Sequence, residues 1–89
     1  MKRILLTTQF KKDFKKCKKQ NKPLADFQKV IDLLISGADL PTAYKDHPLK
    51  GQWSDFRDLH IAPDWLLIYQ SDEDSVTLVR TGSHSELFE

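Results

Sequence analysis

Apolar residues recur at helical spacing in the first part of the chain and alternate with polar residues in the second part. Residues 3–7 (RILLT) are apolar and contain neither Gly nor Pro, which predicts a first strand. The next apolar residues lie four and three positions apart, as on one face of a helix: Phe10, Phe14 and Cys17. Thr7 or Thr8 can cap this helix.

A second helix is predicted by a wider apolar stripe, which consists of Leu24, Phe27, Val30, Ile31, Leu34 and Ile35. Pro23 suits its first turn, and Gly37 supplies the stop. About three residues separate the two helices, so an antiparallel helical hairpin is expected. The wider stripe predicts that the second helix is the more buried one.

Residues 38–52 contain two prolines and a glycine and show no period, which predicts a long loop. Long ordered loops in small domains are often functional. His47 lies in this loop directly before Pro48, which favours an extended backbone for the histidine. We expect the loop around His47 to be mobile and to change most when a partner binds.

Three strands are expected next, at residues 53–61, 65–70 and 76–81, with turn signals between them. Gly82 ends the last strand, and the tail SHSELFE forms either a final strand or a single turn. The order βααβββ predicts one α+β domain over residues 1–89. In it, a small antiparallel-rich sheet packs on a helical hairpin.

Alternation along the three strands assigns their faces, provided that both turns are simple hairpin loops. One face would carry Asp58, His60, Trp65, Leu67, Tyr69, Val76, Leu78 and Arg80. The other, nearly apolar face should meet the helices and would carry Arg57, Leu59, Ile61, Leu66, Ile68 and Val79. His60, Trp65 and Arg80 would then cluster at one end of the first face. A single β-bulge would change this assignment.

The composition is that of a globular chain, with 39% hydrophobic and 30% charged residues among 89. The longest apolar run, residues 65–69, is far too short to cross a bilayer, and the N-terminus lacks a signal-peptide pattern. The single cysteine, Cys17, cannot form an internal disulfide, and its spacing suits a small buried residue better than a nucleophile. We therefore expect a cytoplasmic protein without membrane association.

Positive charge is concentrated at the start of the chain. Residues 1–22 carry nine Lys or Arg and one acidic residue, whereas residues 23–89 carry five and twelve. Seven of these cations are lysines within twelve residues: Lys11, Lys12, Lys15, Lys16, Lys18, Lys19 and Lys22. A solvated helix face is one explanation, but a polyanionic partner explains better why so much self-repulsion is tolerated.

Seven residues could meet at one end of the sheet: His47, His60, Asp64, Trp65, Arg80, His84 and Phe88. Metal binding, purely structural histidines and general acid–base catalysis are all open for this cluster. Metal binding is disfavoured because the chain has no closely spaced pair of histidines. Histidine titrates near physiological pH, so one ring can accept a proton while another donates one.

Acid–base histidines beside a basic surface favour RNA cleavage. RNA supplies its own nucleophile, the 2′-hydroxyl. The protein must deprotonate this group, stabilise charge on the phosphate and protonate the leaving 5′-oxygen. Histidines, an aspartate and an arginine suffice for these steps, without a metal or cofactor. Trp65 and Phe88 could stack on the bases of a single strand.

Three segments resemble YafQ-type toxins of the RelE superfamily, the toxin halves of bacterial type II toxin–antitoxin pairs: YKDHPLKGQW, FRDLHIAPDWLLIY and RTGSHSELF. The resemblance covers essentially the whole chain and is strongest over residues 44–88. It implies a RelE-like fold and a ribosome-dependent endoribonuclease that cleaves mRNA in the decoding site. It also implies a cognate antitoxin, through which alone the toxin would reach operator DNA.

The same resemblance implies that the catalytic residues are His47, His60, Asp64 and His84. His84 is assigned as the general acid. His47 or Asp64 is the base, and His60 orients or stabilises the reacting groups.

The resemblance also implies an RNA-binding surface. Arg80 would contact the phosphate, while Trp65 and Phe88 would shape the mRNA path. The lysines of the first helix would contact ribosomal RNA: Lys11, Lys12, Lys15, Lys16, Lys18 and Lys19.

Two other functions stay open on the sequence alone. A non-catalytic toxin on the same scaffold, like the related ParE toxins, would act on a protein target. A plain RNA-binding module would use only the basic helix. The three histidines and Asp64 favour the endoribonuclease over both alternatives.

Overall fold

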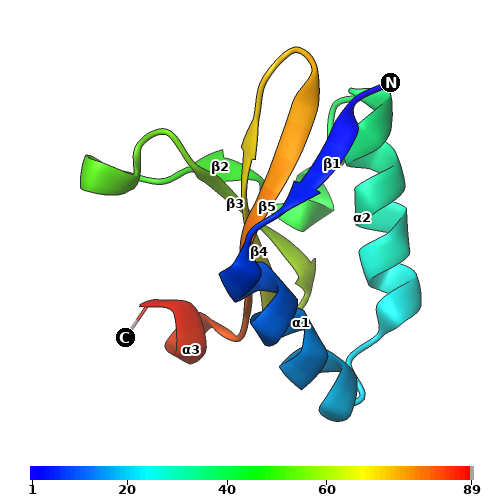
Figure 1. Cartoon of the computed structure of the whole chain (residues 1–89), viewed down its shortest axis with the longest axis vertical. Coiled ribbons are helices and arrows are strands. Elements are labelled where there is room, and N and C mark those ends of the chain that lie inside the picture. Colours follow the sequence, from blue (N-terminus) through cyan, green and yellow to red (C-terminus); the bar gives the residue numbers. More distant parts are fainter. Residues whose placement is uncertain (89) are drawn as a thin grey trace.

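The computed structural model describes residues 1–88, which form five strands and three α-helices (Figure 1). In chain order these are β1 (Arg3–Leu6), α1 (Thr8–Lys19), α2 (Leu24–Ser36), β2 (His47–Pro48), β3 (Arg57–Ala62), β4 (Trp65–Ser71), β5 (Ser75–Gly82) and α3 (His84–Phe88). Short 3-10 helices precede and follow β2, at Thr42–Tyr44 and Gly51–Trp53. The predicted α+β class and the order βααβββ are confirmed, with β2 and α3 in addition.

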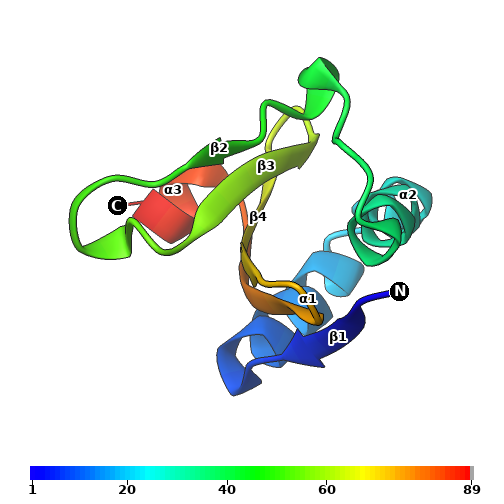
Figure 2. The ribbon, with the colours of Figure 1, turned by 90° about the horizontal axis from the view of Figure 1, so that it is seen from above.

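The strands form a mixed sheet in the order β1-β5-β4-β3-β2. Strands β2 to β5 pair antiparallel with their neighbours, whereas β1 pairs parallel with β5. A parallel pair needs a long connection between its strands. Here α1 and α2 follow β1 in the chain and provide part of the connection to β5. Figure 2 shows the twisted sheet with α1 and α2 to one side of β4 and α3 to the other.

Thr7 determines where α1 begins. Its Oγ1 accepts the N–H of Phe10 at 2.9 Å, which confirms the predicted cap. The same hydroxyl donates to the carbonyl of Val79 at 2.8 Å, so the cap also fastens α1 to β5. Phe10 and Cys17 are each 2% exposed, in agreement with the predicted apolar stripe.

The second helix buries Val30, Ile31 and Leu34. Gly37 ends it with a φ of 75°, a left-handed conformation that favours glycine. Pro23 was expected in the first turn of α2, but it lies directly before the helix as its N-cap residue. Within residues 1–88, no helix has the length and apolar character needed to span a membrane.

The two helices do not run side by side as a close hairpin. They diverge from their connection (Figure 1), because α1 packs along β5 whereas α2 packs on β3 and β5. Three phenylalanines join them: the ring centroid of Phe27 lies 4.7 Å from that of Phe14 and 6.2 Å from that of Phe10. The expected hairpin is therefore an open one, held by aromatic contacts.

The predicted faces are confirmed for β3, but those of β4 and of Val76 and Leu78 in β5 are wrong because two bulges shift the pairing. His60 is opposite Leu66, but Ala62 is opposite Trp65, so β3 has an extra residue between them. A second irregularity lies between Ile68 and Tyr69 in the pairing of β4 with β5. The strand residues that join the helices in the core are Leu59, Ile61, Trp65, Leu67, Tyr69, Val76 and Leu78.

The region predicted as a long loop, residues 38–52, contains more structure than expected. His47 pairs with Asp58, and Pro48 pairs with Arg57. The strand predicted from Trp53 begins only at Arg57, and Trp53 itself is the last residue of a 3-10 helix. His47 therefore belongs to a paired strand and not to a free loop.

Candidate active site

The register of the sheet brings several predicted site residues onto the face that points away from α1 and α2. His47 pairs with Asp58, Asp58 with Ile68, and Ile68 with Arg80, so one row of paired residues crosses four strands and ends at Arg80, whose guanidinium reaches Asp13 of α1. His60 lies two residues beyond Asp58 on β3 and points to the same face. The prediction that His60 and Arg80 share a face agrees with this register.

The ring of His47 is oriented by a backbone carbonyl. Nδ1 lies 2.7 Å from the carbonyl oxygen of Lys45, which can only accept, so Nδ1 must carry a hydrogen. Nε2 lies 3.0 Å from Oδ1 of Asp58. This places the imidazole of His47 beside the carboxyl group of Asp58.

All three histidines influence the carboxyl group of Asp58. The side chain of Asp58 is 7% exposed, and this burial raises its pKa. The charges of His47, His60 and His84 oppose the rise, that of His47 most strongly. Within residues 1–88, Oδ1 has no hydrogen-bond partner, so the contact with His47 has the distance but not the angle of a hydrogen bond.

Asp58 is not among the predicted site residues. The sequence offered one indication of its role: alternation along the predicted strand placed Asp58 on the same face as His60. The two-residue strand β2, which brings His47 beside it, has no signal in the sequence. A buried carboxylate with a raised pKa is suited to accept a proton, so we include Asp58 in the candidate site.

A polar group on the other face holds β2 against β3. Asp46 accepts from Nε and Nη2 of Arg57 at 3.2 and 3.0 Å, and it also accepts a hydrogen bond from the hydroxyl of Tyr69. Burial and the bond to Asp46 raise the pKa of Tyr69. Asp46 directly precedes His47, so this group sets the position of His47 opposite Asp58.

The tail forms a single helical turn, one of the two predicted forms, and brings His84 to the site. The backbone N–H of His84 donates to Oδ1 of Asp64 at 3.3 Å, which ties α3 to the turn after β3. The ring of His84 packs on Phe88, with centroids 5.2 Å apart. Phe88 itself is 41% exposed. Asp64 thus contacts the backbone of α3.

Trp65 lies in the core and not beside His60. It is 1% exposed, its ring stacks on Phe27 with centroids 5.9 Å apart, and its Nε1 donates to Oγ1 of Thr81 at 2.8 Å. The bulge after His60 is the reason, because it moves Trp65 to the helix face. The predicted stacking of Trp65 on RNA does not agree with a ring that protein atoms already cover.

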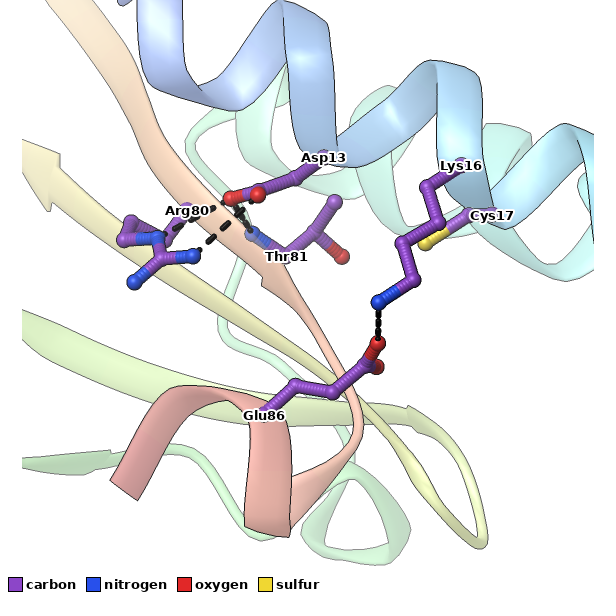
Figure 3. Close-up of a pocket in the computed structure, with 6 residues that line it drawn as sticks. All are labelled: Asp13, Lys16, Cys17, Arg80, Thr81 and Glu86. Carbon is purple, nitrogen blue, oxygen red and sulfur yellow. Dashed lines mark hydrogen bonds and ion pairs between the residues drawn. The ribbon is translucent and has the colours of Figure 1, made fainter. Parts of the chain in front are cut away.

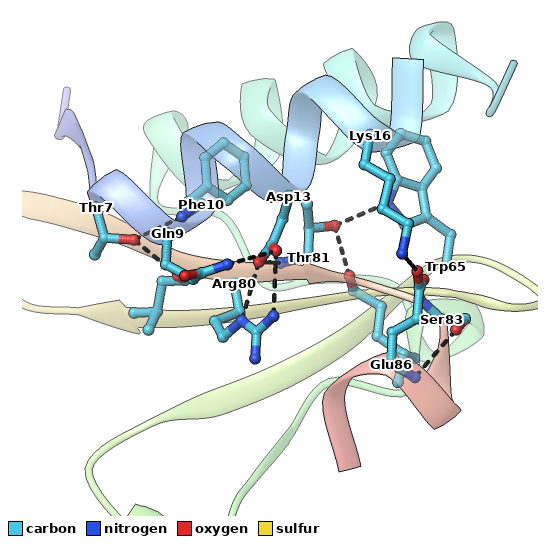
Figure 4. A network of polar contacts seen from close by, with 12 residues as sticks. Thr7, Gln9, Phe10, Asp13, Lys16, Trp65, Arg80, Thr81, Ser83 and Glu86 are labelled. Carbon is cyan, nitrogen blue, oxygen red and sulfur yellow. Dashed lines mark hydrogen bonds and ion pairs between the residues drawn. The ribbon is translucent and has the colours of Figure 1, made fainter. Parts of the chain in front are cut away.

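Arg80 is held by the one acidic residue of the basic segment (Figure 4). Its Nε and Nη2 donate to the carboxylate of Asp13 at 3.0 and 3.2 Å, and the N–H of Thr81 donates to the same group at 3.3 Å. Burial alone would raise the pKa of Asp13, but the hydrogen bonds from Arg80, Gln9 and Thr81 lower it. Asp13 therefore fixes Arg80 from α1.

Five of the six lysines predicted to contact RNA are exposed and have no carboxylate partner within residues 1–88: Lys11, Lys12, Lys15, Lys18 and Lys19. Lys18 extends over the ring of Phe14, with Nζ 5.6 Å from its centroid. Lys16 differs from the other five, because its Nζ forms an ion pair with Glu86 of α3.

Two pockets lie at the ends of this site. One, of about 500 Å³, is lined by Ala43, Tyr44, Lys45, His60, Ile61, Ala62 and Pro63. The other, of about 300 Å³, lies between α1, β5 and α3 and is lined by Asp13, Lys16, Cys17, Arg80, Thr81 and Glu86 (Figure 3). The first is next to an imidazole, whereas the second is crossed by ion pairs. Within residues 1–88, no group of three His, Cys, Asp or Glu residues could hold a metal ion.

Similarity to known proteins extends along the whole chain. The family model described as "Bacterial toxin of type II toxin-antitoxin system, YafQ" matches residues 2–89. The mRNA interferase toxin YafQ of Escherichia coli K12 is 42% identical over 81 residues, which is 90% of this chain and 88% of that protein.

Solved structures agree with this match. YafQ in the E. coli DinJ–YafQ complex aligns with a TM-score of 0.92 at 39% identity and covers 100% of both chains. A metal-bound toxin from Helicobacter pylori aligns with a TM-score of 0.90 at 46% identity, covering 99% of this chain and 100% of that one. The resemblance noted in the sequence is thereby confirmed, and the chain belongs to the YafQ family of toxins from bacterial type II toxin–antitoxin systems.

Proposed function

We propose that this chain is an endoribonuclease that cleaves mRNA as the toxin of a toxin–antitoxin pair. The main support is that the sheet register brings His47 and His60 onto one face with Asp58, where Nε2 of His47 lies 3.0 Å from Oδ1 of Asp58, and that Asp64 attaches His84 to the turn after β3. Such a group of residues can both accept and donate protons, which cleavage by the 2′-hydroxyl requires. The relative in E. coli is named an mRNA interferase, which supports the same substrate.

In this proposal, the pair of His47 and Asp58 is the general base. It takes the proton of the 2′-hydroxyl, and the 2′-oxygen attacks phosphorus. As the bond from phosphorus to the 5′-oxygen breaks, His84 gives that oxygen a proton. The products carry a 2′,3′-cyclic phosphate and a 5′-hydroxyl. Asp64 was the other candidate base, but its contact with the N–H of His84 favours a role in holding α3.

Three more side chains would surround the reacting phosphate. Arg80 uses Nε and Nη2 on Asp13, and its remaining N–H donors can bind a phosphate oxygen. His60 orients the substrate from the pocket of about 500 Å³ beside it, which offers space for a nucleobase. Phe88 is exposed enough to stack on a base, whereas Trp65 is not.

The partners follow from the proposed reaction. The exposed lysines of α1 would contact ribosomal RNA while the histidines meet mRNA in the decoding site, so the protein would act in the cytoplasm. The E. coli relative forms a DinJ–YafQ toxin–antitoxin complex, and we propose that a cognate antitoxin restrains this chain in the same way. Operator DNA would be bound only through that antitoxin.

A short pulse of expression, followed by mapping of mRNA 5′ and 3′ ends, tests the proposal. Wild-type protein should produce new internal ends within translated regions and should arrest growth. His84→Ala should remove both effects and leave antitoxin binding and the melting temperature nearly unchanged, because His84 is exposed. Ser85→Ala, an exposed neighbour in α3, is the matched control and should cleave like wild type.

Each alternative has its own outcome in this experiment. DNA damage without new RNA ends would indicate a ParE-like toxin that acts on a protein target. Ribosome or RNA binding without new ends would indicate a plain RNA-binding module. A His84→Ala variant that cleaves at the wild-type rate would show that His84 is not the general acid.

A further inference from the structure

Helix α3 is too short to be stable by itself. It has five residues, His84–Phe88, and isolated helices of this length are not populated in water. His84 is its first residue, so the position of the imidazole depends on whatever keeps this turn formed. Apart from the bond from the N–H of His84 to Asp64, the polar side-chain contacts that do so converge on Glu86 (Figure 4).

Glu86 closes the turn on itself. Its Oε1 accepts the N–H of Ser83 at 2.8 Å, and its own N–H donates to Oγ of Ser83 at 3.2 Å, a reciprocal capping box. A side chain at Gly82 would place its Cβ 3.2 Å from Oε1 of Glu86, so the absence of one there leaves space for the carboxylate. These contacts order the turn but do not attach it to the rest of the protein.

Besides the bond from the N–H of His84 to Asp64, α3 is attached to the rest of the protein through α1. Oε2 of Glu86 forms an ion pair with Nζ of Lys16 across the pocket of about 300 Å³ (Figure 3). The hydrogen bond from Lys16, followed by that from Ser83, lowers the pKa of Glu86 to about 2, so the carboxylate is charged at physiological pH. The pKa of Lys16 is raised by the same contact, so both partners are charged at physiological pH.

Lys16 lies one turn from Asp13, which holds Arg80 from the same side of α1. Two groups of the proposed site, Arg80 and the turn with His84, are thus connected to one helix face. The other lysines predicted to contact RNA have no such partner within residues 1–88.

We propose that Lys16 and Glu86 are positioning residues, which hold α3 so that His84 lies in place for proton transfer. This inference rests on the proposed function, in which His84 is the general acid. Lys16 then serves the reaction through Glu86, whereas its neighbours on α1 bind RNA. An exposed ion pair contributes little to global stability, but a turn of marginal stability needs only a little to be formed most of the time.

A double-mutant cycle tests the link between the two residues. Lys16→Gln removes the cation, and Glu86→Gln removes the charge while it keeps an oxygen that can accept the N–H of Ser83. Each variant should lower the rate of a single turnover on programmed ribosomes, at saturating protein, by about two- to fivefold, the effect typical of exposed ion pairs. The double variant should be no slower than the slower single one.

Further variants separate positioning from RNA binding. Lys16→Arg retains a cation and should restore the wild-type rate. Lys29→Gln removes an exposed lysine of α2 and should change nothing. Glu86→Ala loses the capping box as well, and the rate should fall by about tenfold or more because both contacts are gone. The melting temperature should stay nearly constant for both Gln variants.

A second measurement does not depend on activity. In Lys16→Gln and Glu86→Gln, the NMR resonances of the His84 ring should move, and the amide of Leu87, which donates to the carbonyl of Ser83 at 3.2 Å, should exchange faster. Unchanged His84 resonances, or effects of the two variants that simply add, would overturn the proposal and make Lys16 an ordinary RNA contact. Wild-type protein that cleaves no RNA would overturn the proposed function, and the NMR result would still decide whether the ion pair orders α3.

Discussion

Burial of Asp58 has opposite effects on folding and on the proposed chemistry. The low exposure of its carboxyl group disfavours the charged form, which raises its pKa and makes ionisation costly for the folded state. The same shift brings the carboxylate closer to the basicity that a general base needs at neutral pH. Nε2 of His47 lies 3.0 Å from Oδ1 of this carboxyl group.

Asp58→Asn should therefore remove cleavage without loss of stability. Because the pKa is raised on folding, the free energy of unfolding of the wild type falls as pH rises from about 4, the unfolded value, through the folded pKa. At pH 7 the variant, which has no such penalty, should resist urea as well as or better than the wild type. Its cleavage rate should fall by about 10²–10⁴-fold.

Asp55→Asn, at an exposed position on the same segment, is the matched control for Asp58→Asn and should alter neither property. Urea unfolding at pH 7 and pH 4 would reveal the difference, since the wild type should improve relative to Asp58→Asn at the lower pH. An Asp58→Asn variant that is less stable at pH 7 and still cleaves would contradict both parts of this prediction.

Trp65 should affect stability and not RNA contact. Trp65→Ala should lower the free energy of unfolding by about 3–5 kcal/mol, because it leaves a cavity beside Phe27 and removes the donor to Oγ1 of Thr81, which then keeps only its own bond to the carbonyl of Leu66. Trp65→Phe keeps most of the packing, and the folded variant should cleave at the wild-type rate. Denaturation curves and single-turnover rates measure the two effects. A large loss of rate in a stable Trp65→Phe protein would instead support the predicted contact of Trp65 with mRNA.

At the scale of elements, β2 has only two residues and depends on side chains for its position. Asp46 connects it to Arg57 and to the hydroxyl of Tyr69, which is 3% exposed. The strand pairs His47 with Asp58 only while this connection holds. The polar group on the helix side of the sheet thus supports the acid–base pair on the other side.

Asp46→Ala should separate His47 from Asp58. It leaves the buried hydroxyl of Tyr69 without its acceptor, at a cost of about 1–3 kcal/mol in the free energy of unfolding. Hydrogen exchange at Leu49, whose N–H donates to the carbonyl of Phe56 at 2.9 Å, should become faster, and cleavage should slow. Asp39→Ala removes an exposed carboxylate nearby and should do neither. Normal cleavage by Asp46→Ala would show that β2 does not need this contact.

The elements that a local pattern encodes could be predicted from the sequence. The stripe of Phe10, Phe14 and Cys17, the cap at Thr7 and the stop at Gly37 are decided within a few residues, and all of them agree with the structure. The sheet faces could not be predicted in this way. One extra residue after His60 reverses the alternation, and a bulge depends on distant strand pairing.

The candidate site also combines residues that local sequence identifies with residues that only the fold reveals. The histidines and Asp64 could be recognised by their chemistry and by the motifs around them, although their roles stay predictions. Asp58 and Asp13 were missed, because each matters through a partner far away in sequence: His47 for the first and Arg80 for the second. Such pairs become visible only when the fold brings the elements together.

At the scale of the whole molecule, the exposed lysines of α1 form a basic surface on the side of α1 not packed on β5. Because lysines that contact phosphates release counterions, ribosome binding should weaken steeply as salt increases. Substitution of Lys11, Lys12, Lys15 and Lys19 by Gln should weaken binding. The slope of log affinity against log salt should also flatten by about 0.7–0.9 for each lysine that contacts a phosphate.

Binding at several salt concentrations measures this slope, and Lys29→Gln on α2 should leave it unchanged. If the variant with four Lys→Gln substitutions has the wild-type slope, these lysines do not contact phosphates and form only a solvated helix face.

The parallel pairing of β1 with β5 also affects how the protein is made. Arg3 lies opposite Ser75, so the first strand to be synthesised must wait for one of the last. At about 5–20 residues per second, that wait is about 4–14 s. Until it ends, β5 is absent, the sheet is incomplete, and α3 with His84 does not yet exist. A nascent chain therefore lacks β5 and His84, and the candidate site is complete only after synthesis has passed α3.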